Sequence, residues 1–217
     1  LYPSVIRALN MSIETFIGQF TSPDKDDDPL YGEMAWNGVN AKDDNEWCAL
    51  TIDGAMTMTG AEWHAFIREM GYAVSAFGTL FDQSKPGMVA DTLTFWFSER
   101  KRLQAEKKKY GKLAKEEKDP VKKAEYLRLE EHYDLLQLTK KIQLNSAYGA
   151  IGNPHFRFFD LRNAVAITTT GQLSIRWIEN ELNSYLRKVL KSEEDFVIAV
   201  DTDSVYLNLS ELVYKAL

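Results

Sequence analysis

The strongest constraint on the fold is a pair of long helical segments separated by one Asp-Pro step. From Asp91 onward the pattern is helical, and Asp91 or Thr92 can accept the first free backbone N–H groups of a helix. Asp119-Pro120 interrupts this run, and a second helix is predicted from about Val121 to Gly149, where apolar residues recur at helical spacing. Two such helices joined by a short break predict a long antiparallel hairpin.

The predicted hairpin is basic towards its tip, although the chain as a whole is acidic. The formal net charge is −6, whereas residues 100–125 hold eleven Lys or Arg and five Asp or Glu, which leaves −12 for the remainder. This asymmetry has two interpretations: a basic element that faces phosphate, or an ordinary solvated helical surface.

Shorter elements are predicted on both sides of the hairpin, so the fold class is α+β. We predict a helix over 61–70, a strand over 72–82, a turn over 83–87 and a helix over 161–190. The apolar run 196–200 predicts a buried strand, and the chain resumes a strand at 205–207 after an acidic interruption. The acidic segments 22–29 and 43–46 lack the spacing of a calcium loop and are interpreted as solvated insertions.

Composition narrows the class of protein. The chain has 217 residues, 45% hydrophobic and 27% charged, which predicts a globular protein with a real core. It has no apolar stretch long enough to cross a bilayer, so no membrane partner is expected. The single cysteine, Cys48, excludes an internal disulfide and suits a reducing cytoplasm, and three histidines with one cysteine argue against a zinc site.

Two carboxylates, Asp201 and Asp203, stand at the bend between two apolar strands. Burying this acid is costly unless a positive charge lies beside it, and hard oxygen ligands suit Mg²⁺. Two such ions could activate a hydroxyl and stabilise a leaving group. An isolated Asp-x-Asp is also common in plain turns, so the pattern alone leaves both interpretations open.

A second candidate site lies at the end of the second helix of the hairpin. Lys141, Asn145 and Tyr148 are spaced i, i+4 and i+7, so they share one helix face that could hold a triphosphate and stack on a base pair. Arg100 and Lys101 fall opposite this region if the helices fold back, and like charges held together imply an anion between them. The alternative is a solvated rim with both cations in water.

The motifs together resemble family B DNA polymerases. The end of the first polymerase motif resembles Leu1-Tyr2-Pro3-Ser4. The second motif, K-x3-N-S-x-Y-G, is similar to Lys141 to Gly149, and the third, D-T-D-S, is similar to Asp201-Thr202-Asp203-Ser204. All three occur in family order. The stretches 145–153, 156–163 and 167–169 are similar to the replicative polymerases of T-even-like bacteriophages.

The resemblance implies a polymerase palm with antiparallel strands that carries a helical fingers hairpin. It divides the chain into residues 1–90 (palm, with insertion loops), 91–149 (fingers) and 150–217 (palm, with the Asp-Thr-Asp hairpin). The resemblance also implies a role for each site residue. Two Mg²⁺ ions would be bound by Asp201 and Asp203, and the incoming dNTP would be bound by Arg100, Lys141, Asn145 and Leu1. Tyr2 would exclude a ribose 2′-hydroxyl, and the base pair would be monitored by Tyr148 and Gly149.

Departures from the family pattern set further expectations. The metal-binding aspartate of the first motif should precede Leu1, Ala199-Val200 stands where Tyr-Gly is frequent, and Gln104 replaces a second fingers cation. Exonuclease and thumb domains have no counterpart. We therefore expect a fragment that is inactive alone, either part of a longer enzyme or one chain of a split polymerase completed by a second polypeptide.

The expected function is template-directed DNA synthesis on a primer-template, in the cytoplasm of a bacterial host if a phage encodes the chain. An RNA-directed or RNA-making palm polymerase is the alternative with the same chemistry, and Tyr2 as a sugar gate argues against RNA synthesis. From another class, the chain could be a non-catalytic DNA-binding or assembly module that uses the hairpin as a charged arm.

Overall fold

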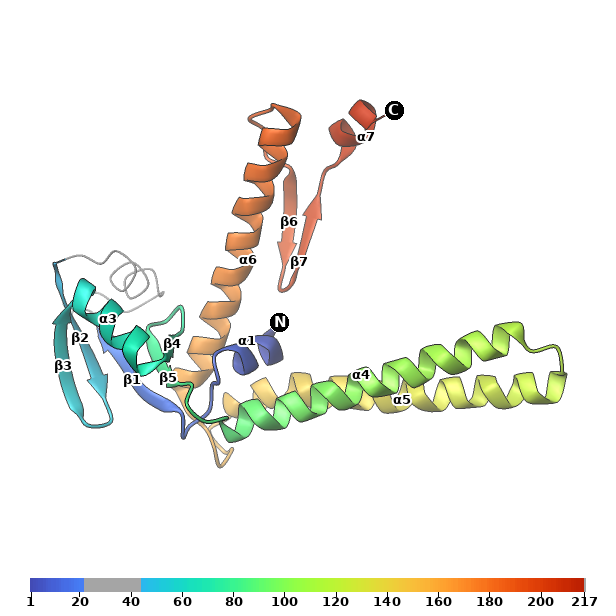
Figure 1. The fold of residues 1–217 in the computed structure, drawn as a ribbon, viewed down its shortest axis with the longest axis horizontal. Helices are drawn as coiled ribbons and strands as arrows, with labels where there is room; N and C mark the ends of the chain where they lie inside the picture. Colours follow the sequence, from blue (N-terminus) through green and yellow to red (C-terminus); the bar gives the residue numbers. More distant parts are fainter. Residues whose placement is uncertain (22–43, 217) are drawn as a thin grey trace.

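The computed structural model describes residues 1–21 and 44–216, and three parts meet at a short N-terminal helix (Figure 1). An antiparallel sheet lies on one side, a long helical hairpin extends to the other, and a third long helix rises between them with a two-stranded hairpin beside it. This mixed architecture confirms the predicted α+β class.

The sheet has five strands in the order β3-β2-β1-β5-β4, and every neighbouring pair is antiparallel. The strands are β1 (Phe16–Thr21), β2 (Glu46–Thr51), β3 (Gly54–Thr59), β4 (Tyr72–Val74) and β5 (Thr79–Asp82). Helix α3 (Gly60–Met70) follows β3 and begins with a reciprocal capping box between Thr59 and Glu62. Its Trp63 is fully buried and donates its indole N–H to the Trp47 carbonyl at 2.7 Å.

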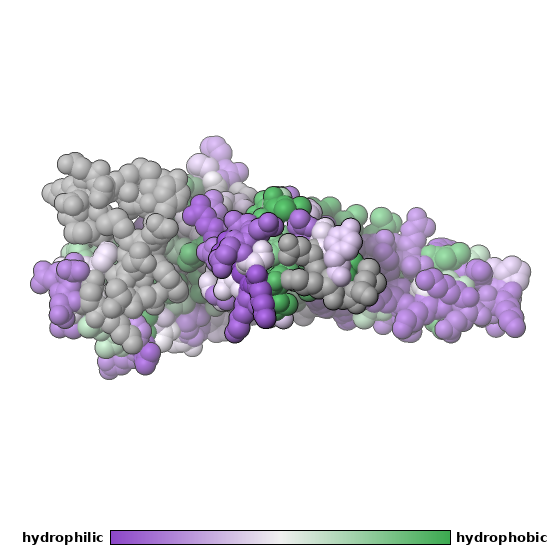
Figure 2. All heavy atoms as spheres, turned by 90° about the horizontal axis from the view of Figure 1, so that it is seen from above, coloured by the Kyte–Doolittle hydropathy of each residue, from purple (hydrophilic) through white to green (hydrophobic). Residues whose placement is uncertain are grey.

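The hairpin consists of α4 (Met88–Glu116) and α5 (Pro120–Ile151). Asp119 caps α5 by accepting from the Val121 N–H at 2.9 Å, and Pro120 lacks only an N–H that the first turn does not use. The helices hold together through a Tyr110–Tyr133 stack with ring centroids 5.5 Å apart. The predicted antiparallel hairpin is confirmed, and hydrophilic side chains cover much of its outer part in Figure 2.

The third part begins with α6 (Leu161–Leu190), which has the predicted bounds. It is followed by β6 (Val197–Asp201), β7 (Ser204–Leu207) and α7 (Ser210–Ala216). A small apolar cluster of Leu186, Leu190 and Phe196 joins the end of α6 to the start of β6.

Helix α1 (Tyr2–Ala8) lies where the three long helices converge and contacts α4, α5 and α6. Its Val5 and Ile6 are buried in the largest apolar cluster, which also includes Leu93 of α4, Leu144 of α5 and Ile167 of α6. The chain thus buries its main core around a helix of only seven residues.

Four predictions of local structure need correction. The predicted strand over 72–82 is a hairpin of two strands, because Gly78 takes a positive φ of 76° and reverses the chain. Helix α4 begins at Met88 with Gly87 as its cap, so neither Asp91 nor Thr92 is the capping residue. The strand predicted to be buried at 196–200 is β6, and most of its residues are exposed.

The fourth correction concerns the acidic insertions. The segment 22–29 and Asp43 lie outside the described residues, whereas Glu46 begins β2 of the sheet. The hairpin of β2 and β3 was not predicted. None of the helices within the described ranges combines the length and apolar character needed to cross a bilayer.

Candidate nucleotide-binding and metal-binding site

Asp201 and Asp203 occupy the tight turn that joins β6 to β7. Asp201 pairs with Ser204, which leaves Thr202 and Asp203 as the two residues of the turn. Thr202 takes a φ of 49°, a value that β-branched residues adopt rarely, and its hydroxyl donates to Asp201 Oδ1 at 3.0 Å. Both carboxylates are exposed, so the turn is not buried and the cost of burying its acid does not arise. They are open to a ligand.

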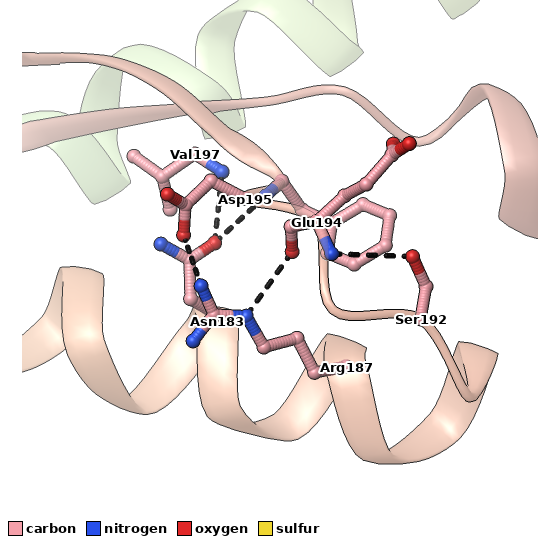
Figure 3. A network of polar contacts seen from close by, with 7 residues as sticks. Asn183, Arg187, Ser192, Glu194, Asp195 and Val197 are labelled. Atoms are coloured by element: carbon pink, nitrogen blue, oxygen red, sulfur yellow. Dashed lines mark hydrogen bonds and ion pairs between the residues drawn. The ribbon is translucent and has the colours of Figure 1, made fainter.

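A polar network fixes this hairpin to the end of α6 (Figure 3). The side-chain oxygen of Asn183 accepts from the backbone N–H groups of Phe196 and Val197, at 2.8 and 3.0 Å. Arg187 donates to the Glu194 carbonyl at 3.2 Å and to Asp195 Oδ1 at 2.6 Å. Because these contacts lie at the start of β6, α6 determines where the acidic turn points.

The acidic turn reaches the N-terminal end of α1. The backbone nitrogen of Leu1 lies 3.4 Å from Asp203 Oδ2, which places the turn beside the start of this segment. The next residue, Tyr2, stacks on Tyr148 of α5 with ring centroids 4.4 Å apart. Gly171 of α6 permits this approach, since a Cβ there would lie 3.1 Å from Leu1 Cδ2 and 3.4 Å from Tyr2 Cε1. The structure therefore brings segments of all three motifs together.

The predicted face of α5 is present and partly free. Lys141, Asn145 and Gly149 are exposed, while Tyr148 is half-buried under Tyr2. A side chain at Gly149 would meet no other atom within 4 Å. This face can therefore accept a ligand next to the tyrosine pair.

Arg100 lies on α4 opposite α5, as predicted, and its neighbour is Gln137. Gln137 Oε1 accepts from Arg100 Nε at 3.5 Å and from Gln104 Nε2 at 3.4 Å. Gln137 precedes Lys141 by one helical turn, so the two cations lie on adjacent parts of the hairpin. Lys101 instead lies over the Phe97 ring, with its nitrogen 5.5 Å from the ring centroid.

Gln137 is a site residue that the sequence analysis missed. Its Nε2 donates to Asp134 Oδ1 at 2.8 Å, and Lys107 forms an ion pair with the same oxygen at 2.8 Å. The hydrogen bonds from Lys107 and Gln137 lower the pKa of Asp134, which therefore stays charged and holds the amide in place. One feature of the sequence could have indicated Gln137: it lies four residues before Lys141, on the same face of the helix.

The atoms that the acidic turn can offer to a metal are oxygens, which are the ligands that a hard cation prefers. Asp201 and Asp203 supply carboxylate oxygens, and Mg²⁺ is commonly held by one or two carboxylates with substrate oxygens completing its shell. Within residues 1–21 and 44–216, no group of three or more His, Cys, Asp or Glu side chains is placed to hold a metal ion. The two acids of the turn are thus the protein ligands that the described chain can offer here.

An antiparallel sheet, a long helical hairpin and a two-carboxylate turn meet at one short helix, which is the arrangement that the resemblance to family B DNA polymerases implies. The chain belongs to DNA polymerase family B, whose sequence model matches residues 1–216. The predicted resemblance is therefore confirmed.

Relatives with known names support this assignment. The chain is 54% identical over 80 residues to a DNA-directed DNA polymerase of Enterobacteria phage T4 and 49% identical over 80 residues to that of Escherichia phage RB69. Each match covers 36% of this chain and 9% of the relative. The chain thus matches only a small part of these polymerases.

A solved structure shows the same fold. The family B DNA polymerase from the hyperthermophilic archaeon Pyrobaculum calidifontis matches with a TM-score of 0.50 and 20% identity. The match covers 99% of this chain and 20% of that one. The likeness shows the fold, and the chain matches about a fifth of that protein.

Proposed function

We propose that this chain takes part in template-directed DNA synthesis, in which a primer 3′-hydroxyl attacks the α-phosphate of a bound dNTP. The observation that carries the proposal is the proximity of the Asp203 turn to the Leu1 backbone, together with the stack of Tyr2 on Tyr148. These contacts join an acidic turn to a helix face that presents Lys141 and Asn145. Membership of family B supports the same reaction.

In this proposal the residues of the hairpin bind and orient the nucleotide. Arg100 and Lys141 hold the triphosphate, Asn145 supports the same face, and Gln137 positions the Arg100 side chain. The backbone at Leu1 contacts phosphate, and Tyr2 packs under the sugar and excludes a 2′-hydroxyl; the stack on Tyr148 supports this role by holding the Tyr2 ring against α5. Tyr148 and Gly149 monitor the base pair. Catalysis then consists of positioning and charge stabilisation.

Asp201 and Asp203 would hold two Mg²⁺ ions. When bound, such ions lower the pKa of the attacking hydroxyl and stabilise the leaving pyrophosphate. The protein contributes the position of the acids, which the Asn183 network fixes through β6. The exposed carboxylates leave room for substrate oxygens in the metal shell.

The division into palm (1–90 and 150–217) and fingers (91–149) is part of this proposal, as are its partners. These are primer-template DNA, a dNTP and either flanking domains or a second polypeptide. The site of action is the cytoplasm of a bacterial host.

The test measures binding of Mn²⁺ and of a fluorescent dNTP to the chain. We expect Asp203→Asn to abolish specific Mn²⁺ binding, measured by electron paramagnetic resonance. Lys141→Ala and Arg100→Ala should each weaken binding of the Mn²⁺-loaded dNTP by about tenfold, which corresponds to roughly 1.4 kcal/mol. A charge-assisted contact to phosphate supplies energy of this order.

The chain offers a matched control for the acidic turn. Asp53 is the second residue of the turn between β2 and β3, where Thr51 pairs with Gly54, just as Asp203 is in its own turn. Asp53→Asn should leave Mn²⁺ binding unchanged. Equal losses for both variants, or no binding of Mn²⁺ and dNTP together, would favour a non-catalytic DNA-binding or assembly module instead.

A further inference from the structure

A cavity of about 460 Å³ lies at the root of the hairpin, where α4 begins, α5 ends and the chain turns through residues 152–159. Small-molecule sites in proteins usually measure about 300 to 1,000 Å³. The cavity therefore has the size of a binding site, and none of the functions proposed above uses it.

The cavity lies behind the proposed nucleotide face. Gln143, Ala147 and Ala150 line it, and they follow the same i, i+4, i+7 spacing as Lys141, Asn145 and Tyr148. The two sets are offset by two residues, which is about 200° around a helix of 3.6 residues per turn. One helix thus carries the nucleotide face on one side and the cavity wall on the other.

The lining defines the chemistry of a ligand. Trp96, Phe156 and Phe158 contribute aromatic walls, and Phe156 and Phe158 meet edge to face with centroids 5.6 Å apart. Of the described residues that line the cavity, none is charged. The uncharged lining favours a neutral molecule, since a charged group packed against these side chains would lose its hydration. Flat aromatic surfaces suit walls of this kind.

One polar group in the wall lacks a partner. Gln143 Oε1 is buried without a hydrogen bond in the described structure, which is unfavourable for an amide oxygen. The terminal torsion of glutamine is broad, so a small rotation would turn this oxygen towards a donor in the cavity. An N–H or O–H on the ligand would satisfy it.

We propose that this cavity binds a neutral, flat aromatic molecule that carries one hydrogen-bond donor. Its aromatic surface packs between Trp96 and the Phe156–Phe158 pair, and its donor bonds Gln143. Because α4, α5 and the turn at 152–159 all contribute to the wall, the ligand bridges the root of the fingers. Its binding does not depend on the proposed polymerase function.

The test uses N-phenyl-1-naphthylamine, a neutral fluorescent molecule with two aromatic units and one N–H. We expect saturable binding with enhanced fluorescence. Ala150→Phe fills the cavity from α5 and Thr92→Phe fills it from α4, and each should raise the Kd by about tenfold or more. Ala124→Phe makes the same change at an exposed position of α5 outside the cavity and should leave the Kd unchanged.

Two further probes test the chemistry. The anionic analogue 8-anilino-1-naphthalenesulfonate should bind more weakly than the neutral molecule. The N-methyl derivative lacks the donor, so it should bind more weakly to the wild type, and Gln143→Leu should remove that preference. Unchanged probe binding in folded Ala150→Phe and Thr92→Phe variants, checked by circular dichroism, would overturn the proposal.

Discussion

Asp160 holds the start of α6 mainly through contacts with Arg162, and the backbone N–H of Asn163 also contributes. Its carboxylate accepts from the backbone N–H of Arg162 at 2.9 Å and from the guanidinium at 3.1 and 2.7 Å. That guanidinium lies 3.8 Å above the Phe16 ring, so the contact also joins α6 to the sheet. Burial alone would raise the pKa of Asp160, but the hydrogen bonds and charge of Arg162 together outweigh it and lower the pKa.

This balance predicts how Asp160 contributes to stability at different pH values. A lowered pKa means that the contribution is present above the pKa of an unfolded aspartate, 3.8, and is lost as the pH falls through the folded pKa. Asp160→Ala removes both the helix cap and the negative charge, so it should lower the free energy of unfolding by about 1 kcal/mol at neutral pH. Asp160→Asn keeps a cap acceptor and should cost less. Urea unfolding measures both.

The pH series supplies the internal control for this prediction. The difference in stability between the wild type and Asp160→Asn should shrink below pH 3.8, where the wild-type carboxylate becomes protonated. A difference that stays constant from neutral pH to pH 3 would contradict a charge-based role for Asp160.

Single residues of the candidate site were predicted from the order of the motifs, and the structure brings Tyr2, Tyr148 and Asp203 into one region. Their contacts could not be predicted. The stack of Tyr2 on Tyr148 and the position of Gln137 depend on segments far apart in the chain. The exposure of Asp203 was also unpredictable, because an apolar strand beside it suggests burial, whereas among the described strands β6 pairs with β7 alone.

At the scale of elements, the long helices and the two strands β6 and β7 were predictable, whereas most strands of the five-stranded sheet were not. Leu161–Leu190 and the hairpin carry many turns of periodic pattern, and Pro120 fixes the break. Strands of three to six residues contain too few alternations to reveal a hairpin such as β4–β5. Their existence depends on pairing across the sheet, which the local sequence does not encode.

Asn183 is the residue that connects two elements of the site, α6 and β6. Replacing it by leucine leaves the N–H groups of Phe196 and Val197 without an acceptor. We expect a loss of about 1 to 3 kcal/mol, since unsatisfied buried donors keep their full desolvation cost. Urea unfolding gives the total loss, and hydrogen exchange at the Phe196 and Val197 amides locates it.

Two variants bracket this prediction. Asn183→Asp retains an acceptor oxygen and should preserve protection of both amides better than leucine does. Asn180→Leu makes the same change at an exposed position of α6 and should have little effect. Equal exchange rates in the Asn183→Leu and Asn180→Leu variants would show that the network does not anchor β6.

At the scale of the whole molecule, the described chain has three separate apolar clusters rather than one core. The largest surrounds α1, the second lies between the sheet and α3, and the third joins α6 to β6. Helix α1 contacts each of the three long helices. The relative position of nucleotide face and acidic turn therefore depends on this one short helix.

This arrangement predicts that removing buried side-chain volume from α1 destabilises α4, α5 and α6 together. Ile6 is fully buried in the central cluster, and Ile6→Ala should cost about 2 to 5 kcal/mol. Because α4, α5 and α6 share that cluster, their amide protection against hydrogen exchange should fall in parallel. Ile67→Ala, in the cluster of the sheet and α3, is the matched control and should lower protection mainly there. If Ile6→Ala changed exchange in α1 alone, the three long helices would be held by their own contacts, and α1 would not set the geometry of the site.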